Sequence, residues 1–493
     1  MISRATLLGA ALLAMACTAC NTFSDLEEAA PGTNNATSNT NNATNNTNNA
    51  SNGSNNATNN TNNATNNTNN TTNGSNNATN GSNNATNNAT NNTTGGPVRL
   101  VTINCDREAP VSSNYVPLTS DYGGFNGTNC VAADPRRFSF GVKDVTHPAQ
   151  NLSLVTTGDG FRGVWSSDSG IQTIESGGKV ESLTLGSVGP NATEVVLIPT
   201  AENLFSLAHL DANLCGLAID MTPEAADLGT RQLTVDDCPA DPHGLTYAGG
   251  YNPFHPSGSH ESHLVLFSGS NSITYDIGED AIGQNATGTL PNLLVLPNPY
   301  IEPTSGRFIG FLDQAQDFHL RGVLSDQAPL PLLDQREPGT VALVHLANEH
   351  YALASIEQDH VSITLIQAGI DDGTAEIWTE TGAIWNVPTG SNVRYLDMAV
   401  VDGGLVLFVD QDGSWTMIPI RVRTSSTDGE TLDCQVALRY EYPASIDYND
   451  VDMAVSKVGN CGIRAAVLTS FNIGNPSYVH LEGADFPNFY FSP

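Results

Sequence analysis

The sequence predicts an all-β domain over residues 97–493, behind a short apolar leader and a long polar tether. Three observations support this prediction. Short runs of apolar and β-branched residues recur along the domain, bounded by Gly, Asp, Asn or Pro. Almost no stretch has sustained helical periodicity. A unit of strand, Gly turn, strand, loop and strand occurs twice, with the Asp-Met-Ala-Val motif starting at Asp397 and again at Asp452.

Residues 1–20 form a predicted export signal. Arg4 precedes about a dozen small and apolar residues, whereas a helix that spans a bilayer needs about 20. Leu13–Cys17 places a Cys after small and apolar residues, and Cys20 is a second candidate. This leader resembles the lipobox of bacterial lipoproteins, in which the Cys becomes the acylated first residue. The resemblance implies lipidation at Cys17, with Cys20 as the alternative and an ordinary cleaved signal still open.

Two further positions bear on the lipobox resemblance. Ala14 stands where the family prefers Leu, three residues before Cys17. In that family an Asp directly after the Cys retains the protein at the inner membrane, and here Thr18 or Asn21 occupies that place. The resemblance therefore implies a lipid anchor in the outer membrane or at the cell surface.

Residues 21–96 form the predicted tether. Within it, Asn34–Thr94 consists almost entirely of Asn, Thr, Ala and Ser, without charged or aromatic residues. Such a segment cannot bury enough apolar surface to offset its conformational entropy, so it is predicted to be disordered. A flexible chain of about 60 residues has a root-mean-square reach on the order of 45 Å. The tether would hold the domain away from the membrane.

The charge balance excludes one class of partner. The chain has 51 acidic and 18 basic residues, of which only Lys143, Lys179 and Lys457 are lysines. A surface that binds nucleic acid needs clustered Lys and Arg, so no nucleic-acid partner is expected. An acidic, lysine-poor composition resembles that of proteins from salt-adapted organisms, and a cation-binding surface is the alternative.

The cysteines outside the leader favour export and structural disulfides. Six cysteines allow fifteen connectivities, and pairing between sequence neighbours has the smallest loop-closure cost. None lies in a C-x-x-C motif, so a zinc or thioredoxin-like site is disfavoured. The three neighbouring pairs are Cys105 and Cys130, Cys215 and Cys238, and Cys434 and Cys461.

The repeat length indicates a ring of blades. Dividing residues 97–493 by the offset between Met398 and Met453 gives about seven units, and units of this length are typical of propellers and solenoids. The pattern resembles that of bacterial β-propeller proteins and predicts a β-propeller of about seven blades, with six or eight also open. Val98–Asn104 is predicted to pair with the last blade and close the ring. The predicted blades are 138–186, 193–236, 244–279, 292–326, 340–387, 393–443 and 450–490.

A His-rich loop, Asn252–His263, is the weak metal candidate. His255, His260 and His263 are potential zinc ligands, but their spacing matches no known pattern and a solvated loop is favoured. Calcium is a second option at acidic segments, although a full D-x-[DN]-x-[DN]-G loop is missing and turn-forming Asp is favoured. The acidic segments are Asp371–Gly373 and the group Asp447, Asn449, Asp450 and Asp452.

Two turns and two tryptophans complete the candidates. Ser166–Gly170 and Asp410–Trp415 resemble the Asp-box turns of sialidase-like propellers, which are structural turns remote from catalysis. Trp378 and Trp385 would suit a sugar-stacking platform, although core packing is favoured.

The catalytic motifs G-x-S-x-G, P-loop and H-E-x-x-H are missing from the sequence, so no catalytic residue is assigned. Together these features favour a non-enzymatic, surface-tethered binding or scaffold module whose partner is an envelope protein or polysaccharide. An extracytoplasmic hydrolase or lyase acting on glycans and a self-associating coat protein are the alternatives. Propellers have many unrelated activities, so the fold alone does not choose among them.

Overall fold

The computed structural model divides the chain into two units, Met1–Gly95 and Gly96–Pro493. It describes strands and short turns of the second unit between Val101 and Phe489. Residues 1–100, residues 106–135 and a number of loops between strands lie outside the described residues, and so do Cys17 and Cys20. The described part contains no helix, and hence none with the length and apolar character needed to cross a membrane.

The described strands form seven sheets. Three of them contain β3 (Gln150–Thr157), β4 (Gly160–Ser167), β5 (Gly170–Glu175) and β6 (Val180–Ser182); β7 (Ala192–Ala201), β8 (Leu204–Asp211), β9 (Cys215–Met221) and β10 (Thr230–Gln232); and β11 (Pro242–Gly250), β12 (His260–Ser268), β13 (Asn271–Ile277) and β14 (Ile282–Thr289).

Two more contain β15 (Ile301–Glu302), β16 (Phe308–Leu312), β17 (Phe318–Gly322) and β18 (Leu330–Leu333); and β19 (Val341–Ala347), β20 (His350–Ile356), β21 (His360–Ala368), β22 (Ala375–Ile377) and β23 (Gly382–Asn386). The last two contain β24 (Val393–Val401), β25 (Gly404–Gln411), β26 (Ser414–Ser425), β27 (Gly429–Cys434), β28 (Leu438–Tyr440) and β1 (Val101–Asn104); and β29 (Asp447–Val458), β30 (Gly462–Asn472), β31 (Ser477–Pro487) and β2 (Arg136–Val145).

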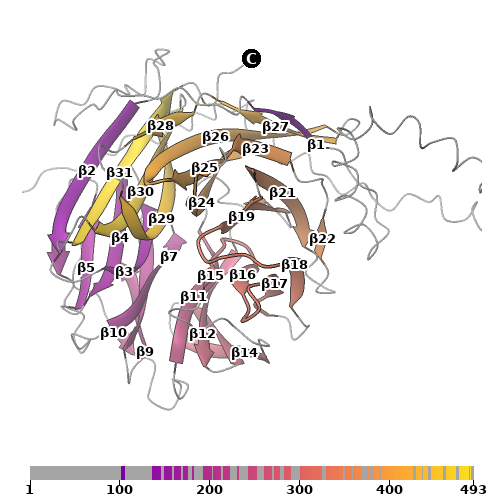
Figure 1. Ribbon diagram of the computed structural model, residues 1–493. Coiled ribbons are helices and arrows are strands. Elements are labelled where there is room, and N and C mark those ends of the chain that lie inside the picture. Colours follow the sequence, from indigo (N-terminus) through magenta and orange to yellow (C-terminus); the bar gives the residue numbers. More distant parts are fainter. Residues whose placement is uncertain are drawn as a thin grey trace, which may run out of the picture. The chain divides into compact units, whose positions relative to one another are not determined.

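The seven sheets follow one another around a centre in chain order (Figure 1). In each sheet the first of its consecutive strands is the inner one, because β29 lies beside β3, β3 beside β7, β7 beside β11, β19 beside β24 and β24 beside β29. The strands β1 and β2 join the sixth and seventh sheets at the opposite, outer edge. A bridge between Ala248 and Thr304 joins β11 to the β15 segment, and Tyr300 donates a hydrogen bond to the Val341 carbonyl at β19. This arrangement is a β-propeller, so the predicted fold class is confirmed.

The ring is closed by strands from the two ends of the propeller sequence. β2 pairs antiparallel with β31, from Arg136 opposite Asp485 to Val145 opposite Ser477. The prediction that Val98–Asn104 closes the ring is therefore wrong, and so is the assignment of residues 138–145 to the first blade. β1 instead pairs parallel with β27 at the outer edge of the sixth sheet.

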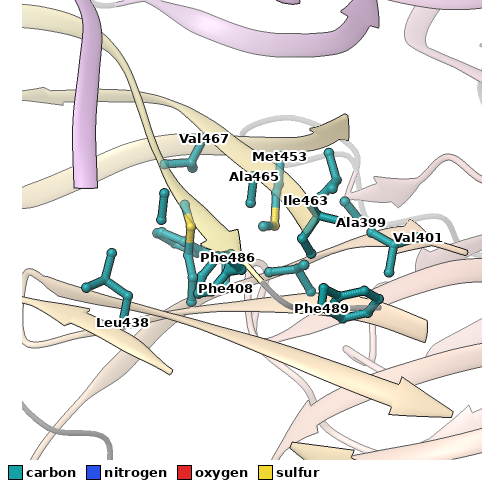
Figure 2. Close-up of a cluster of buried hydrophobic side chains, with 14 of the residues drawn as sticks. Ala399, Val401, Phe408, Leu438, Met453, Ile463, Ala465, Val467, Phe486 and Phe489 are labelled. Carbon is teal, nitrogen blue, oxygen red and sulfur yellow. The ribbon is translucent and has the colours of Figure 1, made fainter. Parts of the chain in front are cut away.

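Apolar side chains fill the spaces between neighbouring sheets. Between the sixth and seventh sheets, Phe408, Met417, Met453 and Phe486 pack together with Phe489 (Figure 2). These side chains are almost completely buried, and burial of one such side chain contributes about 1.5–3 kcal/mol. Because each sheet is covered on both faces, its middle strands are apolar without alternation, as in β25.

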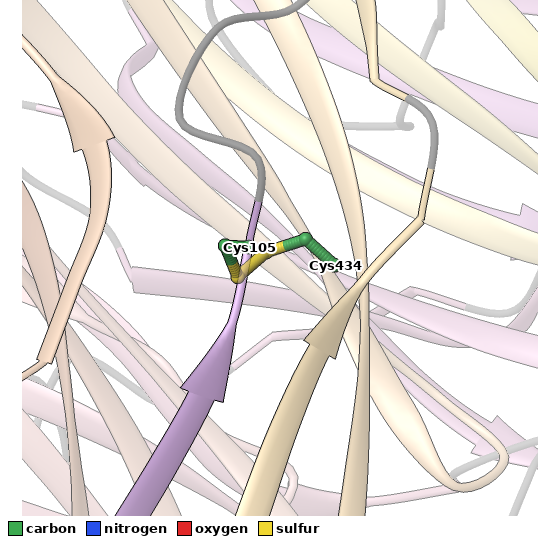
Figure 3. The surroundings of a disulfide bond; sticks show 2 residues. All are labelled: Cys105 and Cys434. Carbon is green, nitrogen blue, oxygen red and sulfur yellow. A yellow bond between two sulfur atoms is a disulfide. The ribbon is translucent and has the colours of Figure 1, made fainter.

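A disulfide links the two ends of the parallel pair β1–β27. Cys105 follows β1, Cys434 ends β27, and the two sulfurs are bonded (Figure 3). The predicted pairing of sequence neighbours is therefore wrong for these two residues, which leaves Cys130 and Cys461 without their predicted partners. The reason is that strand pairing, and not loop length, brings Cys105 beside Cys434 across 329 positions.

Candidate functional site: a central acidic cluster

Each inner strand has one edge that pairs with the second strand of its sheet and one edge without a neighbour in that sheet. Backbone N–H groups on the unpaired edge need acceptors when they are shielded from water. Side chains of the preceding sheet supply several of them. Ser153 Oγ accepts the N–H of Leu197 at 3.0 Å, and a Glu302 carboxylate oxygen accepts that of Leu343 at 3.4 Å. We call these contacts inter-blade clasps.

The clasps are most complete where β29 meets β3. Asp450 Oδ2 accepts the Leu152 N–H at 2.8 Å, and Asp452 Oδ2 accepts the Leu154 N–H at 2.6 Å. The Oδ1 atom of each carboxylate accepts the N–H of the next residue in its own strand, Val451 or Met453. Each Asp therefore uses one oxygen to fix its own side chain and the other to hold the neighbouring sheet.

Asp397 occupies the same position in β24 that Asp452 occupies in β29, because both open an Asp-Met-Ala-Val segment. Its Oδ1 accepts the Met398 N–H at 2.7 Å, as in the other two carboxylates. Its Oδ2 is shielded from solvent and has no hydrogen-bond partner. Asp397 therefore makes no inter-blade clasp through its Oδ2 atom.

Four carboxyl groups act on one another at the centre of the ring. Burial is the largest cause that raises the pKa of Asp397. Asp452, Glu302 and Asp450 raise it further, while the hydrogen bond from the Met398 N–H lowers it. Glu302 is in the fourth sheet, whereas Asp450 and Asp452 are in the seventh, so these interactions cross the centre. We call Glu302, Asp397, Asp450 and Asp452 the central acidic cluster.

Burial also raises the pKa of the other cluster members. It raises the pKa of Glu302 and of Asp452 to about 7, and that of Asp450 to about 6, in each case against lowering by backbone hydrogen bonds. Burial is likewise the main cause that raises the pKa of Tyr247, on which Asp452 and Asp397 also act. Carboxyl groups with such pKa values exchange protons near neutral pH.

The expectation that turn-forming Asp residues explain the acidic segment at 447–452 is wrong for Asp450 and Asp452. Both lie inside β29, and each accepts a backbone N–H of β3 in the neighbouring sheet. Sequence reasoning singled out these two residues, and it also noted Asp397 as the start of a repeat. It missed Glu302, for which no local signal existed, since its electrostatic effect on the others comes from another sheet of the ring.

The His-rich segment is partly a strand. β12 begins at His260, so the predicted loop ends earlier than expected. His263 is buried, and its Nδ1 lies 2.8 Å from Asp276 Oδ1, opposite it on β13. Within the described residues, no three Asp, Glu, His or Cys side chains are arranged to hold a metal, and His255 lies outside those residues.

The Asp410–Trp415 segment is a tight hairpin turn between β25 and β26. Asp412 and Gly413 have φ values of 56° and 78°, which is typical of a type I′ turn. Trp415 is buried, and its indole N–H donates to Glu482 at 2.9 Å. Trp385 is buried as well and donates to Gln411 at 3.2 Å, so it belongs to the core, while Trp378 is outside the described residues.

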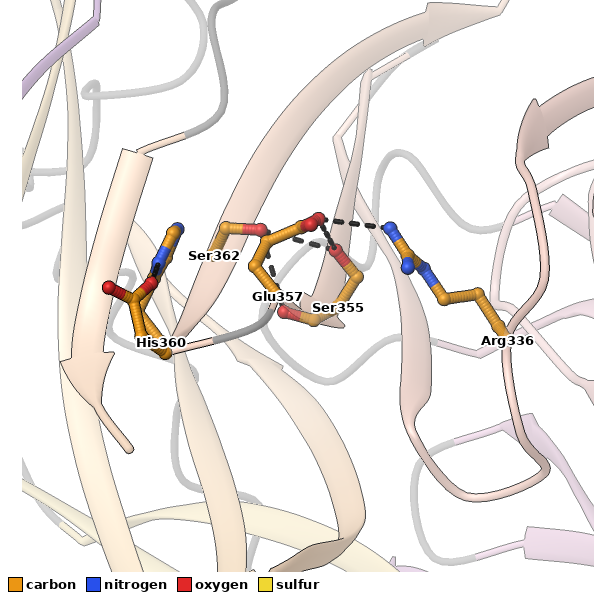
Figure 4. Close-up of polar contacts among 6 residues, drawn as sticks. Arg336, Ser355, Glu357, His360 and Ser362 are labelled. Carbon is orange, nitrogen blue, oxygen red and sulfur yellow. Dashed lines mark hydrogen bonds and ion pairs between the residues drawn. The ribbon is translucent and has the colours of Figure 1, made fainter. Parts of the chain in front are cut away.

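A polar group in the fifth sheet contains the residue types of a catalytic triad, but its geometry differs. Ser355 Oγ and Ser362 Oγ lie 3.1 Å apart, and Ser355 also donates to Glu357, which pairs with Arg336 (Figure 4). His360 pairs with the adjacent Asp359 at 2.7 Å and with neither serine. Both serines are buried, so the group ties β20 to β21 instead of presenting a nucleophile.

Comparison with known proteins gives no family for this chain. No protein-family model matches it, and no curated protein does. Among solved structures, a six-bladed fucose-binding lectin from Aleuria aurantia matches with a TM-score of 0.36 and 11% identity, over 58% of this chain and 94% of the lectin. The WD40 domain of Neurospora crassa Pan2 matches with a TM-score of 0.39 and 7% identity, over 70% of this chain and 95% of that domain. Since both scores are below 0.5, the fold assignment is based on the strand order described above.

Proposed function

We propose that this protein is a surface-tethered, non-enzymatic binding or scaffold lipoprotein of the cell envelope. Its polar partner, an envelope protein or a polysaccharide, binds to the propeller, and acylation at Cys17 anchors the chain. The tether, residues 21–96, gives the propeller reach from the membrane.

One observation carries the binding or scaffold role: the buried polar side chains of the ring make contacts that hold sheets together. Ser153, Asp450 and Asp452 accept backbone N–H groups of the next sheet, while Ser355 and Ser362 bond to each other within the fifth sheet. Side chains used in this way stiffen the ring and leave recognition to the loops. A rigid ring that displays loops loses little conformational entropy when it binds a partner.

The test uses the oxidised Gly96–Pro493 unit, immobilised at high salt and exposed to envelope proteins and envelope polysaccharides of the source cells in separate experiments. The proposal expects saturable, stoichiometric binding of one of the two classes, with turnover of neither. Mass-labelled lipid on the full-length chain, lost when Cys17→Ser is introduced, tests the anchor independently. Binding that never saturates would contradict the binding role, and lipid retained on that variant would contradict acylation at Cys17.

The central acidic cluster favours a second candidate, a glycan-active hydrolase or lyase. A carboxyl group with a pKa near 7 beside an ionised carboxylate is the arrangement that a general acid and a nucleophile or base require. Asp452→Asn and Asp397→Asn separate the candidates. Hydrolysis of a polysaccharide that either substitution abolishes would establish the enzyme, whereas partner binding that is unchanged in Asp397→Asn supports the scaffold.

A further inference from the structure

The inner strands β24 and β29 carry a bulge at equivalent positions. Arg394 is the extra residue of β24 opposite β25, and Asn449 is the extra residue of β29 opposite β30. Each lies three positions before the Asp of its Asp-Met-Ala-Val motif, so both are at the same end of the ring. A bulge leaves one residue unpaired and re-aims its side chain, and bulges are common beside functional sites. Asn449 is exposed, whereas the preceding Tyr448 is buried, so this bulge presents Asn449 to solvent.

Contacts from three strands hold Asn449 in place. The Tyr395 hydroxyl of the sixth sheet donates to the Asn449 backbone carbonyl at 2.8 Å. Asn472 Nδ2 donates to Asn449 Oδ1 at 3.3 Å, and Asn472 Oδ1 accepts the hydroxyl of the buried Ser477 at 2.6 Å. Asn472 ends β30 and Ser477 begins β31, so these contacts lie beside the loop between those strands. Both amide oxygens are occupied within the protein, which fixes the orientation of the two amides.

The hydrogen-bonding groups that remain are donors. An Asn side chain has one oxygen acceptor and an NH₂ group with two donor hydrogens. Within the described residues, Asn449 keeps both of its NH₂ hydrogens for a ligand and Asn472 keeps one. Both residues are exposed. This surface therefore offers donors in fixed positions to the oxygen atoms of a ligand.

Tyr395 and Tyr478 supply aromatic rings at the same end of the sixth and seventh sheets. Both are partly buried against the apolar cluster that contains Phe471, and Tyr478 stacks on Phe471 with 5.6 Å between the ring centres. The core thus holds each ring while part of the residue stays accessible. An aromatic ring packs against the C–H face of a sugar, and nearby polar groups then bind its hydroxyl oxygens.

We propose that Tyr395, Asn449 and Asn472 form a subsite that binds a neutral sugar residue of a polysaccharide. The inference rests on the proposed function and selects the polysaccharide over the envelope protein as the partner. The sugar is neutral because the chain has 51 acidic and 18 basic residues, which repel an acidic polysaccharide. Sugar hydroxyls accept the amide hydrogens without bringing a negative charge to this surface.

The test titrates the oxidised full chain, in a detergent without a sugar headgroup, with the neutral polysaccharide fraction of the source-cell envelope and with dextran, mannan and xylan. Calorimetry gives the affinity. Asn449→Asp keeps the oxygen that accepts from Asn472 and replaces the outward NH₂ group by an oxygen. We expect saturable binding by the wild type and a loss of affinity of about tenfold or more in this variant. Asn386→Asp is the matched control, because Asn386 is an exposed Asn at the end of the outer strand β23, and its affinity should be unchanged.

Tyr395→Phe is a second variant, which keeps the ring and removes only the hydroxyl that holds Asn449, so we expect a smaller loss of about threefold. Circular dichroism shows whether each variant is folded. Polysaccharide binding that Asn449→Asp leaves unchanged would overturn this subsite and leave the proposed function standing. Saturable binding of an envelope protein and of no polysaccharide would overturn it in favour of a protein partner. Saturable binding of neither class would overturn both this inference and the proposed function.

Discussion

Ser153 provides the simplest residue-scale test of the clasps. Its side chain is buried, and its Oγ is the acceptor for the Leu197 N–H. Ser153→Ala would leave that N–H buried without a partner, so we expect the free energy of unfolding to fall by about 1–3 kcal/mol. Denaturant unfolding followed by circular dichroism measures the change.

Ser391→Ala is the control for this substitution, because Ser391 is partly exposed and has no side-chain hydrogen bond within the described part of the chain. An equal loss in both variants would mean that the clasp contributes nothing specific. Ser153→Thr, which keeps the acceptor, should recover part of the loss.

Asp452 illustrates what the sequence reveals at the residue scale. Its repetition in the Asp-Met-Ala-Val motif identified an equivalent residue, Asp397, 55 positions earlier. The different hydrogen bonding of the two could not be predicted, because it depends on which backbone lies across the sheet boundary. The same local sequence therefore gives one Asp whose Oδ2 accepts a hydrogen bond from the neighbouring sheet and one Asp whose Oδ2 has no hydrogen-bond partner.

At the scale of the strands, buried carboxyl groups on the strands make stability depend on pH. Burial raises the folded-state pKa of six of them, Asp397 included, so the folded chain holds protons that the unfolded chain releases. Stability from these groups is complete below their ordinary pKa, near 4, and is lost as the pH rises through their folded values. The values are about 7 for Glu194, Glu302, Asp410 and Asp452, and about 6 for Asp450.

We therefore expect the melting temperature, measured without divalent cations at constant ionic strength, to be higher at pH 5 than at pH 8. His480 opposes this trend, because burial lowers its pKa and its stabilisation grows as the pH rises toward 6.5. One histidine does not outweigh six carboxyl groups. Glu302→Gln should flatten the profile, and a melting temperature that rises steadily from pH 5 to pH 8 would contradict the prediction.

The strand β1 is attached to the sixth sheet by a disulfide as well as by strand pairing. It has four residues, pairs with β27 alone, and is followed at once by Cys105. Replacing Cys105 and Cys434 by Ser should cost about 2–5 kcal/mol, since the cross-link constrains the unfolded chain. In hydrogen exchange, we expect the amides of Val101–Asn104 to lose protection while those of β24 and β25 keep it.

That pattern follows because ring closure is made by β2 and β31, not by β1. Equal loss of protection throughout the sixth sheet would show that the disulfide holds the whole sheet together. Recovery of protection in wild-type protein that is reoxidised after reduction serves as the control.

Most strands could be predicted because their apolar runs are local. The mostly apolar runs Gly404–Val409 and Ile463–Leu468 predict strands, and they lie within the middle strands β25 and β30. β2 was predicted as a strand region but assigned to the wrong sheet. Its partner β31 lies at the other end of the sequence, and no local pattern contains that pairing. The disulfide was missed for the same reason.

At the scale of the whole molecule, a buried ion pair joins the closing strand β2 to β31 within the seventh sheet and packs against the sixth sheet. Arg137 of β2 donates to Glu482 at 2.8 Å from Nε, and its guanidinium lies 3.2 Å from the centre of the Tyr440 ring. Glu482 also accepts the Trp415 N–H. Arg137→Ala would leave Glu482 buried without its counter-charge, so we expect a loss of about 3–5 kcal/mol.

Arg423→Ala is the matched control for this substitution. Arg423 pairs with Asp433 at 2.7 Å, but its side chain is 52% exposed, and such a pair is worth about 0–1 kcal/mol. Calorimetry at two scan rates measures both variants. A loss for Arg137→Ala as small as that for Arg423→Ala would mean that closure does not depend on the buried pair.

The position of the disulfide has a mechanical consequence if the chain is anchored at its N-terminal end as proposed. A pull on the tether reaches Cys105 before it reaches residues 106–135 and β2. The cross-link transfers the tension to β27, which is paired with β26 in a sheet of six strands. Without it, the same tension would run along the chain to Arg136 and peel β2 from β31 one hydrogen bond at a time. The disulfide therefore keeps tension away from the β2–β31 pair that closes the ring, even when a bound partner pulls on the tethered propeller.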